Sequence, residues 1–177
     1  LVVAIPTEAW ENAGLLAAAG SVSISGTMAS DLLVSLNSDD TSELQVPATV
    51  TIPAGQTSAT FDVTVVNDAD HDGAQTAIVT ATATGFVDGS QAMVVRDDDL
   101  HHFSFGAISS PQTASVAFGV TLSAKDVNDA TIAVYTTAAN LSGAGDGGAV
   151  AIAPLTTGAF VAGVWTGNVT VSAVDTN

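Results

Sequence analysis

Short runs of alternating apolar and polar residues cover most of the chain, and Gly, Pro, Asn and Asp separate these runs. Alternation with a period of two predicts half-buried β-strands. Residues 13–20 fit a helical turn, a bulged strand or a loop. Closely spaced strands of this kind predict an antiparallel sandwich. In the first half we predict strands at residues 1–5, 21–26, 32–37, 43–46, 49–52, 59–67, 75–84 and 91–96.

The character of the sequence changes after residue 99, where acids become fewer and aromatic residues more frequent. The glycine-rich run at 142–148 predicts a flexible loop, because a phosphate cradle needs a following helix and usually a lysine. We therefore predict an all-β fold of two tandem antiparallel β-sandwiches of immunoglobulin-like type, at residues 1–99 and 100–177. In the second half we predict strands at 101–107, 116–126, 131–137, 149–153, 158–161 and 164–173.

These strands of the second half are fewer than the seven or more of an immunoglobulin-like sandwich. The expected last strand is missing before the chain stops at residues 174–177. This indicates either a fragment end or completion of the sheet by a strand from a neighbouring chain. The apolar run LVVAI at residues 1–5 is a candidate donor.

The formal charge of −16, from 18 acids and 2 bases, excludes the usual nucleic-acid binders and argues against docking on anionic membranes. No apolar run is long enough to insert across a bilayer. Cysteine is absent, so no disulfide framework or thiol nucleophile is possible. The chain starts at Leu1 without a signal-like segment, and we expect a processed product or a piece of a longer protein.

Three adjacent acids, Asp97, Asp98 and Asp99, follow an alternating strand at the predicted domain boundary. Like charges this close need a counter-charge, and the only bases of the chain are Arg96 and Lys125. A hard divalent cation such as calcium prefers carboxylate and carbonyl oxygens. The run therefore predicts a calcium site that stiffens the joint between the domains.

Four motifs of the first half occur in a fixed order: ENAG at 11–14, VTIPAGQTSATFDVTVVND at 50–68, DHDG at 70–73 and VVRDDD at 94–99. With them, the first half resembles a Calx-beta domain, the calcium-binding sandwich of sodium–calcium exchangers and of large bacterial surface proteins. The resemblance implies calcium at one end of the sandwich. Asn67 and Gln75 replace acids that are usual in the family, which implies fewer or weaker ions. The implied ligands are Glu11, Asp68, Asp72, Asp97, Asp98 and Asp99, with Asp70 through its carbonyl, and Asp40 from the loop that also holds Asp39.

The second half is similar to an immunoglobulin-like module of bacterial adhesins. The motifs are PQTA at 111–114, FGVTLSAKD at 118–126 and GVWTGNVTV at 163–171. This resemblance implies an architecture and no particular ligand.

Two aromatic features allow alternative interpretations. His101 and His102 suggest a transition metal, and one of them could join His71 and the acids. Adjacent residues on a strand point to opposite faces, so we predict linker residues that do not share an ion. Trp10 fits a core or rim plug better than a sugar platform.

No catalytic motif is present, and we predict a protein that is not an enzyme. The hypothesis is a secreted or cell-surface structural or adhesive segment of a bacterial protein, stiffened by calcium. Its partners are sister domains of a longer chain, neighbouring subunits, or a glycan or other cell-surface ligand. The alternatives are a self-assembling filament or surface-layer subunit joined by strand exchange, and a carbohydrate-binding accessory region of a secreted enzyme.

Overall fold

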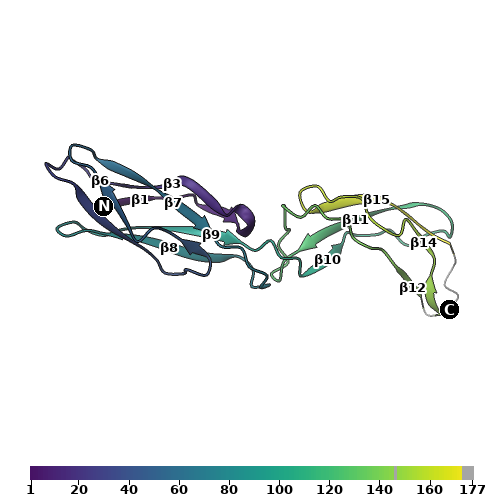
Figure 1. Ribbon diagram of the computed structural model, residues 1–177. Coiled ribbons are helices and arrows are strands. Elements are labelled where there is room, and N and C mark those ends of the chain that lie inside the picture. Colours follow the sequence, from purple (N-terminus) through teal and green to yellow (C-terminus); the bar gives the residue numbers. More distant parts are fainter. Residues whose placement is uncertain (146, 173–177) are drawn as a thin grey trace. The chain divides into compact units, whose positions relative to one another are not determined.

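The chain is all-β in the computed structural model, which describes residues 1–145 and 147–172 (Figure 1). It divides into two compact units, Leu1–Asp97 and Asp98–Asn177. The predicted all-β class is confirmed. Within the described residues, no helix is both long and apolar enough to span a membrane.

The first unit is a sandwich of two sheets. Neighbouring strands are antiparallel except for β2 and β9, which are parallel. One sheet has the order β1 (Val2–Ala4), β3 (Leu15–Ser23), β7 (Ser58–Val65) and β5 (Leu44–Gln45). The other has the order β2 (Glu8–Trp10), β9 (Gly89–Arg96), β8 (Gln75–Thr82), β4 (Leu32–Ser38) and β6 (Thr49–Ile52).

The core of this unit comes from the alternation that predicted its strands. In β7, for example, Phe61, Val63 and Val65 are buried while Asp62 between them is exposed. Side chains of a strand alternate between its two faces, so one face of each sheet supplies the apolar contacts. Residues of both sheets therefore form a single buried cluster.

Most of the segment 13–20 belongs to a bulged strand, one of the three alternatives, which begins at Leu15. A 3-10 turn, η1 (Glu11–Ala13), precedes β3, and the register of β3 against β7 shifts between Leu16 and Gly20. Gly20 lies against Phe61, whose ring would be only 2.2 Å from an added Cβ. The bulge and this close contact explain why the apolar pattern is irregular here.

The run at residues 1–5, the candidate donor strand, is paired and buried within its own unit. Its residues Val2–Ala4 pair antiparallel with β3, and Val3 and Ile5 belong to the buried core. Donating this run to another chain would remove two core side chains from its own unit.

The second unit has a four-stranded antiparallel sheet and a two-stranded hairpin. The sheet has the order β10 (His102–Phe105), β11 (Phe118–Lys125), β15 (Val164–Val171) and β14 (Ile152–Ala153), and the hairpin pairs β12 (Gly143–Gly145) with β13 (Gly148–Val150). Phe103, Tyr135 and Phe160 pack their rings together beside this sheet, with centroids 5.2 to 5.8 Å apart.

Three predictions for the second unit are wrong. Residues 131–137 and 158–161 are not strands and contribute only isolated bridges at Thr131 and Val161. The predicted loop at 142–148 contains β12 and the start of β13. The predictions for 131–137 and 158–161 failed because apolar residues of these segments, such as Tyr135 and Phe160, pack against the sheet without forming a regular strand of it. The predicted end at residues 174–177, with its missing strand, lies outside the described residues.

Gly163 occupies a position that only glycine tolerates. Its φ is +72°, and a Cβ atom there would lie 2.3 Å from the carbonyl oxygen of Ile132. We expect Gly163→Ala to destabilise the second unit by more than about 1 kcal/mol, because the backbone conformation and the contact are both unfavourable. Denaturant unfolding followed by fluorescence of Tyr135, the single tyrosine of the chain, measures this.

The matched control is Gly158→Ala. There the added Cβ meets nothing closer than 3.6 Å, the distance to the Trp165 Nε1 atom. Equal midpoints for the two variants would contradict the prediction.

Candidate metal centre

The parallel pairing of β2 with β9 brings two carboxylates together from distant parts of the sequence. Trp10 is opposite Arg96 in this ladder, so the next residues, Glu11 and Asp97, leave the sheet side by side. Each has only 1% of its surface exposed. Burial of a charged group is costly, so two adjacent buried acids are an unusual feature of the unit.

Asp99 completes a group of three acids. Glu11, Asp97 and Asp99 each offer one carboxylate oxygen, and the three oxygens lie within 4.8 Å of one another. We call these residues the acidic centre. The Oε2 atom of Glu11 is buried and accepts no hydrogen bond from the described residues. A buried oxygen in this state is suited to a cation.

The loop after β7 is tied to the acidic centre through its backbone. The N–H of Gly73 donates a hydrogen bond to Asp97 Oδ2 at 3.0 Å, and Gly73 has a φ of +77° that favours glycine. The N–H of Asp70 donates to Asp68 Oδ1 at 2.8 Å, which closes a local turn. Asp68 and Asp72 are exposed, and both raise the pKa of Glu11 by charge repulsion.

Glu43 belongs to this end of the sandwich, and the sequence analysis missed it. Glu43 was predicted to begin a strand, but β5 begins at Leu44, and the Glu43 side chain is buried with 3% of its surface exposed. The Glu43 carbonyl accepts a hydrogen bond from Val66 N–H at 2.9 Å, which ties its loop to the end of β7. The sequence feature that could have indicated Glu43 as a site residue is its position shortly after the acids Asp39 and Asp40.

Burial and mutual repulsion raise the pKa values of the two buried glutamates. The pKa of Glu11 rises from 4.5 to about 8, first because of desolvation and then because of the charges of Asp97, Glu43, Asp68 and Asp72. The pKa of Glu43 rises to about 6, again mainly by desolvation, with repulsion from Asp72, Asp40, Asp68 and Asp97. Both shifts have the same two causes, burial of the carboxyl group and repulsion by the neighbouring acids.

The only arginine of the chain is engaged elsewhere. Arg96 forms an ion pair with Glu8, with its Nε 3.1 Å from Glu8 Oε2, and its guanidinium lies 5.9 Å from the Trp10 ring centroid. Trp10 is half-buried under this cation–π contact, which agrees with the rim-plug interpretation. The only lysine, Lys125, donates a hydrogen bond to Thr131.

The remaining predicted ligands are not members of the acidic centre. Asp40 is half-buried and accepts a hydrogen bond from Ser42 N–H at 3.1 Å. Asp39 accepts one from Ile78 N–H at 2.6 Å, which continues the pairing of β4 with β8 by one residue. Asp70 is exposed, and Asp98 is half-buried; neither is in the three-residue acidic centre.

Comparisons with known proteins find structures that are distantly similar to this chain. No family model matches the sequence, and no curated protein matches it either. A crystal structure of CBD12 from CALX1.2 has a TM-score of 0.47 and 16% identity, over 70% of this chain and 55% of that chain. The calcium binding domain CBD12 of CALX1.1 has a TM-score of 0.46 and 16% identity, over 66% of this chain and 52% of that chain.

Bacterial chaperones are also among the similar structures. The Pseudomonas aeruginosa CupB2 chaperone has a TM-score of 0.40 and 10% identity, over 94% of this chain and 86% of that chain. The chain spans about half of the length of the two CALX structures.

Proposed function

We propose that this chain is a calcium-stabilised structural segment of a bacterial protein that is secreted or displayed on the cell surface. Residues 1–99 act as a Calx-beta-like calcium-binding sandwich, and residues 100–177 act as an immunoglobulin-like module. The observation that carries the proposal is the acidic centre, where carboxylate oxygens of the buried Glu11 and Asp97 and of Asp99 lie within 4.8 Å of one another.

The donor set fits calcium better than other common metals. All three groups of the acidic centre are carboxylates, and calcium takes six to eight oxygen ligands in irregular geometry. Glu43, Asp68 and Asp72 supply further carboxylates at the same end of the unit. Zinc prefers histidine or cysteine in a tetrahedral array, and neither residue is part of the centre.

The proposed mechanism is electrostatic. Without a cation, the carboxylates repel one another, and Glu11 holds a proton at neutral pH. With calcium, the same oxygens share one positive centre, and binding to the folded state alone stabilises it by mass action. Calcium is expected to raise the melting temperature of the metal-depleted protein, and identical melting in chelator and in millimolar calcium would contradict the proposal.

The position of the acids in the sequence extends the proposal to the joint. Asp97 and Asp99 stand on either side of the point where one unit ends and the next begins along the chain. A cation that binds both residues restricts the backbone between them. The stiffened segment then serves as a spacer between sister domains or neighbouring subunits.

Small-angle scattering measures this effect. Calcium is expected to give a narrower distribution of interatomic distances than chelator does, with Glu8→Gln as a control that leaves the acidic centre intact. Superimposable curves with and without calcium would show that the ion does not act on the joint.

A further inference from the structure

A pair of histidines in the second unit lies outside the acidic centre and has a geometry that the sequence analysis did not predict. The Nδ1 atoms of His101 and His102 are 3.1 Å apart, and the two rings are nearly perpendicular, with centroids 5.3 Å apart. Strand alternation was expected to separate them. However, β10 begins at His102, so His101 lies before the strand and the rule does not apply.

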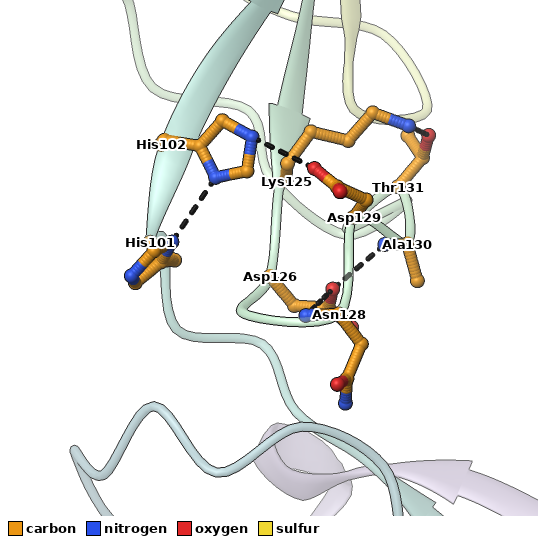
Figure 2. Close-up of polar contacts among 8 residues, drawn as sticks. All are labelled: His101, His102, Lys125, Asp126, Asn128, Asp129, Ala130 and Thr131. Carbon is orange, nitrogen blue, oxygen red and sulfur yellow. Dashed lines mark hydrogen bonds and ion pairs between the residues drawn. The ribbon is translucent and has the colours of Figure 1, made fainter.

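The other nitrogen of His102 is held by a carboxylate. Its Nε2 lies 3.0 Å from Asp129 Oδ1, so Nε2 carries the proton and donates it to this oxygen (Figure 2). In the neutral imidazole the Nδ1 atom of His102 then keeps its lone pair, and Figure 2 shows this atom directed at His101. An oriented imidazole with a carboxylate behind it is the usual arrangement of a metal-ligating histidine.

The loop that presents Asp129 is well fixed. The buried side chain of Asp126 accepts hydrogen bonds through Oδ1 from the N–H groups of Asn128 at 2.9 Å and Ala130 at 2.7 Å. Asp129 has a φ of +64° between these two contacts. The turn thus holds the Asp129 carboxylate toward β10, although its side chain is 82% exposed.

We propose that His101 and His102 chelate a divalent transition-metal ion such as Cu²⁺ through their Nδ1 atoms, with Asp129 as a positioning residue. Metal–nitrogen bonds of about 2.0 to 2.1 Å, combined with a 3.1 Å separation of the nitrogens, give an angle of roughly 100° at the metal. This angle lies between the square-planar and tetrahedral values. Imidazole nitrogen suits copper, nickel and zinc, and copper(II) binds most tightly in this series.

The electron and proton balance of binding is simple. Each Nδ1 donates one lone pair to the metal, and the proton between the two rings moves from His101 Nδ1 to His101 Nε2. His101 is exposed, so water can fill the other coordination positions. The nearby Lys125 ammonium does not occupy the site, because it donates a hydrogen bond to Thr131 Oγ1 at 2.9 Å and runs away from the histidine pair in Figure 2.

Copper(II) titration of the whole 177-residue chain tests the proposal. Millimolar calcium is present throughout to occupy oxygen sites, so the result does not depend on the calcium proposal. The expected result is one copper ion with two imidazole nitrogens in its electron paramagnetic resonance spectrum. His101→Ala and His102→Ala are each expected to weaken binding at least tenfold, while the control His71→Ala binds as the unmodified chain does.

The role of Asp129 has its own readout. Asp129→Ala is expected to weaken copper binding about 10- to 100-fold while both nitrogens stay in the spectrum. Asp129→Asn keeps an acceptor oxygen and is expected to restore part of the affinity. The proposal is overturned if either histidine variant binds copper as tightly as the unmodified chain, or if the spectrum lacks nitrogen ligands. Circular dichroism of each variant verifies that the fold is unchanged.

Discussion

The Glu11→Gln variant is expected to melt at a higher temperature than the unmodified chain in chelator above pH 8, and to gain no stability from calcium. Glu11 is buried, and its pKa of about 8 means that above this pH it adds an uncompensated charge to the folded state. Glutamine removes that charge and also removes a calcium ligand. The variant therefore distinguishes two effects of Glu11: the destabilising charge in the metal-free protein and the binding of calcium.

The expected size of the calcium effect follows from mass action. At a free calcium concentration 100 times the Kd, the unmodified chain gains about 2.7 kcal/mol. For a unit of this size, this corresponds to a rise in Tm on the order of 10 °C. Differential scanning calorimetry in chelator and in calcium measures the Tm of the unmodified chain and of Glu11→Gln.

The matched control is Glu8→Gln. Its side chain is 56% exposed and pairs with Arg96, and Glu8 is not a member of the acidic centre. This variant is expected to keep the full calcium-dependent rise in Tm. A full calcium response in Glu11→Gln would exclude Glu11 as a ligand, and loss of the response in Glu8→Gln would show that any nearby change disrupts it.

The pH dependence of stability is expected to be inverted relative to that of a chain with paired carboxylates. The pKa of Glu11 is about 8 in the folded state and 4.5 in the reference state, so the folded state binds its proton more tightly. A raised pKa of an acid contributes stability at low pH, which is lost as pH rises from the unfolded to the folded value. In chelator, Tm should therefore fall between about pH 4.5 and pH 8. Glu43 adds to this fall between 4.5 and about 6.

Calcium is expected to reverse this trend. The ion binds the deprotonated carboxylate, so its affinity rises with pH up to about 8. Melting curves of metal-depleted protein from pH 5 to 9, with and without calcium, test both slopes. In Glu11→Gln the fall above pH 6 should disappear. A Tm that is independent of pH in chelator would contradict the raised pKa of Glu11.

Local patterns predicted the strands that have one clean apolar face. The alternation at 59–67 gave β7, and the run at 91–96 gave most of β9. The same rule failed at 131–137, where Ile132 is buried although the segment contributes only an isolated bridge at Thr131. Apolar spacing alone cannot distinguish a strand from a loop that packs on one.

The candidate site could be predicted only where its residues are contiguous or belong to a motif. Asp97 and Asp99 stood out as a run of acids, and Glu11 came from the family resemblance. Glu43 was missed because its burial depends on the distant contact of its loop with β7. Likewise, the contact of His101 with His102 depends on where β10 begins, which the alternation does not fix.

Isothermal titration of calcium into the metal-depleted protein at pH 7 tests the central claim most directly. It is performed in two buffers of different ionisation enthalpy. The account predicts saturable binding with release of most of one proton, because Glu11, with a pKa of about 8, is largely protonated at this pH and must lose its proton to bind. No binding, or binding of equal affinity and equal proton release in Glu11→Gln, would contradict it.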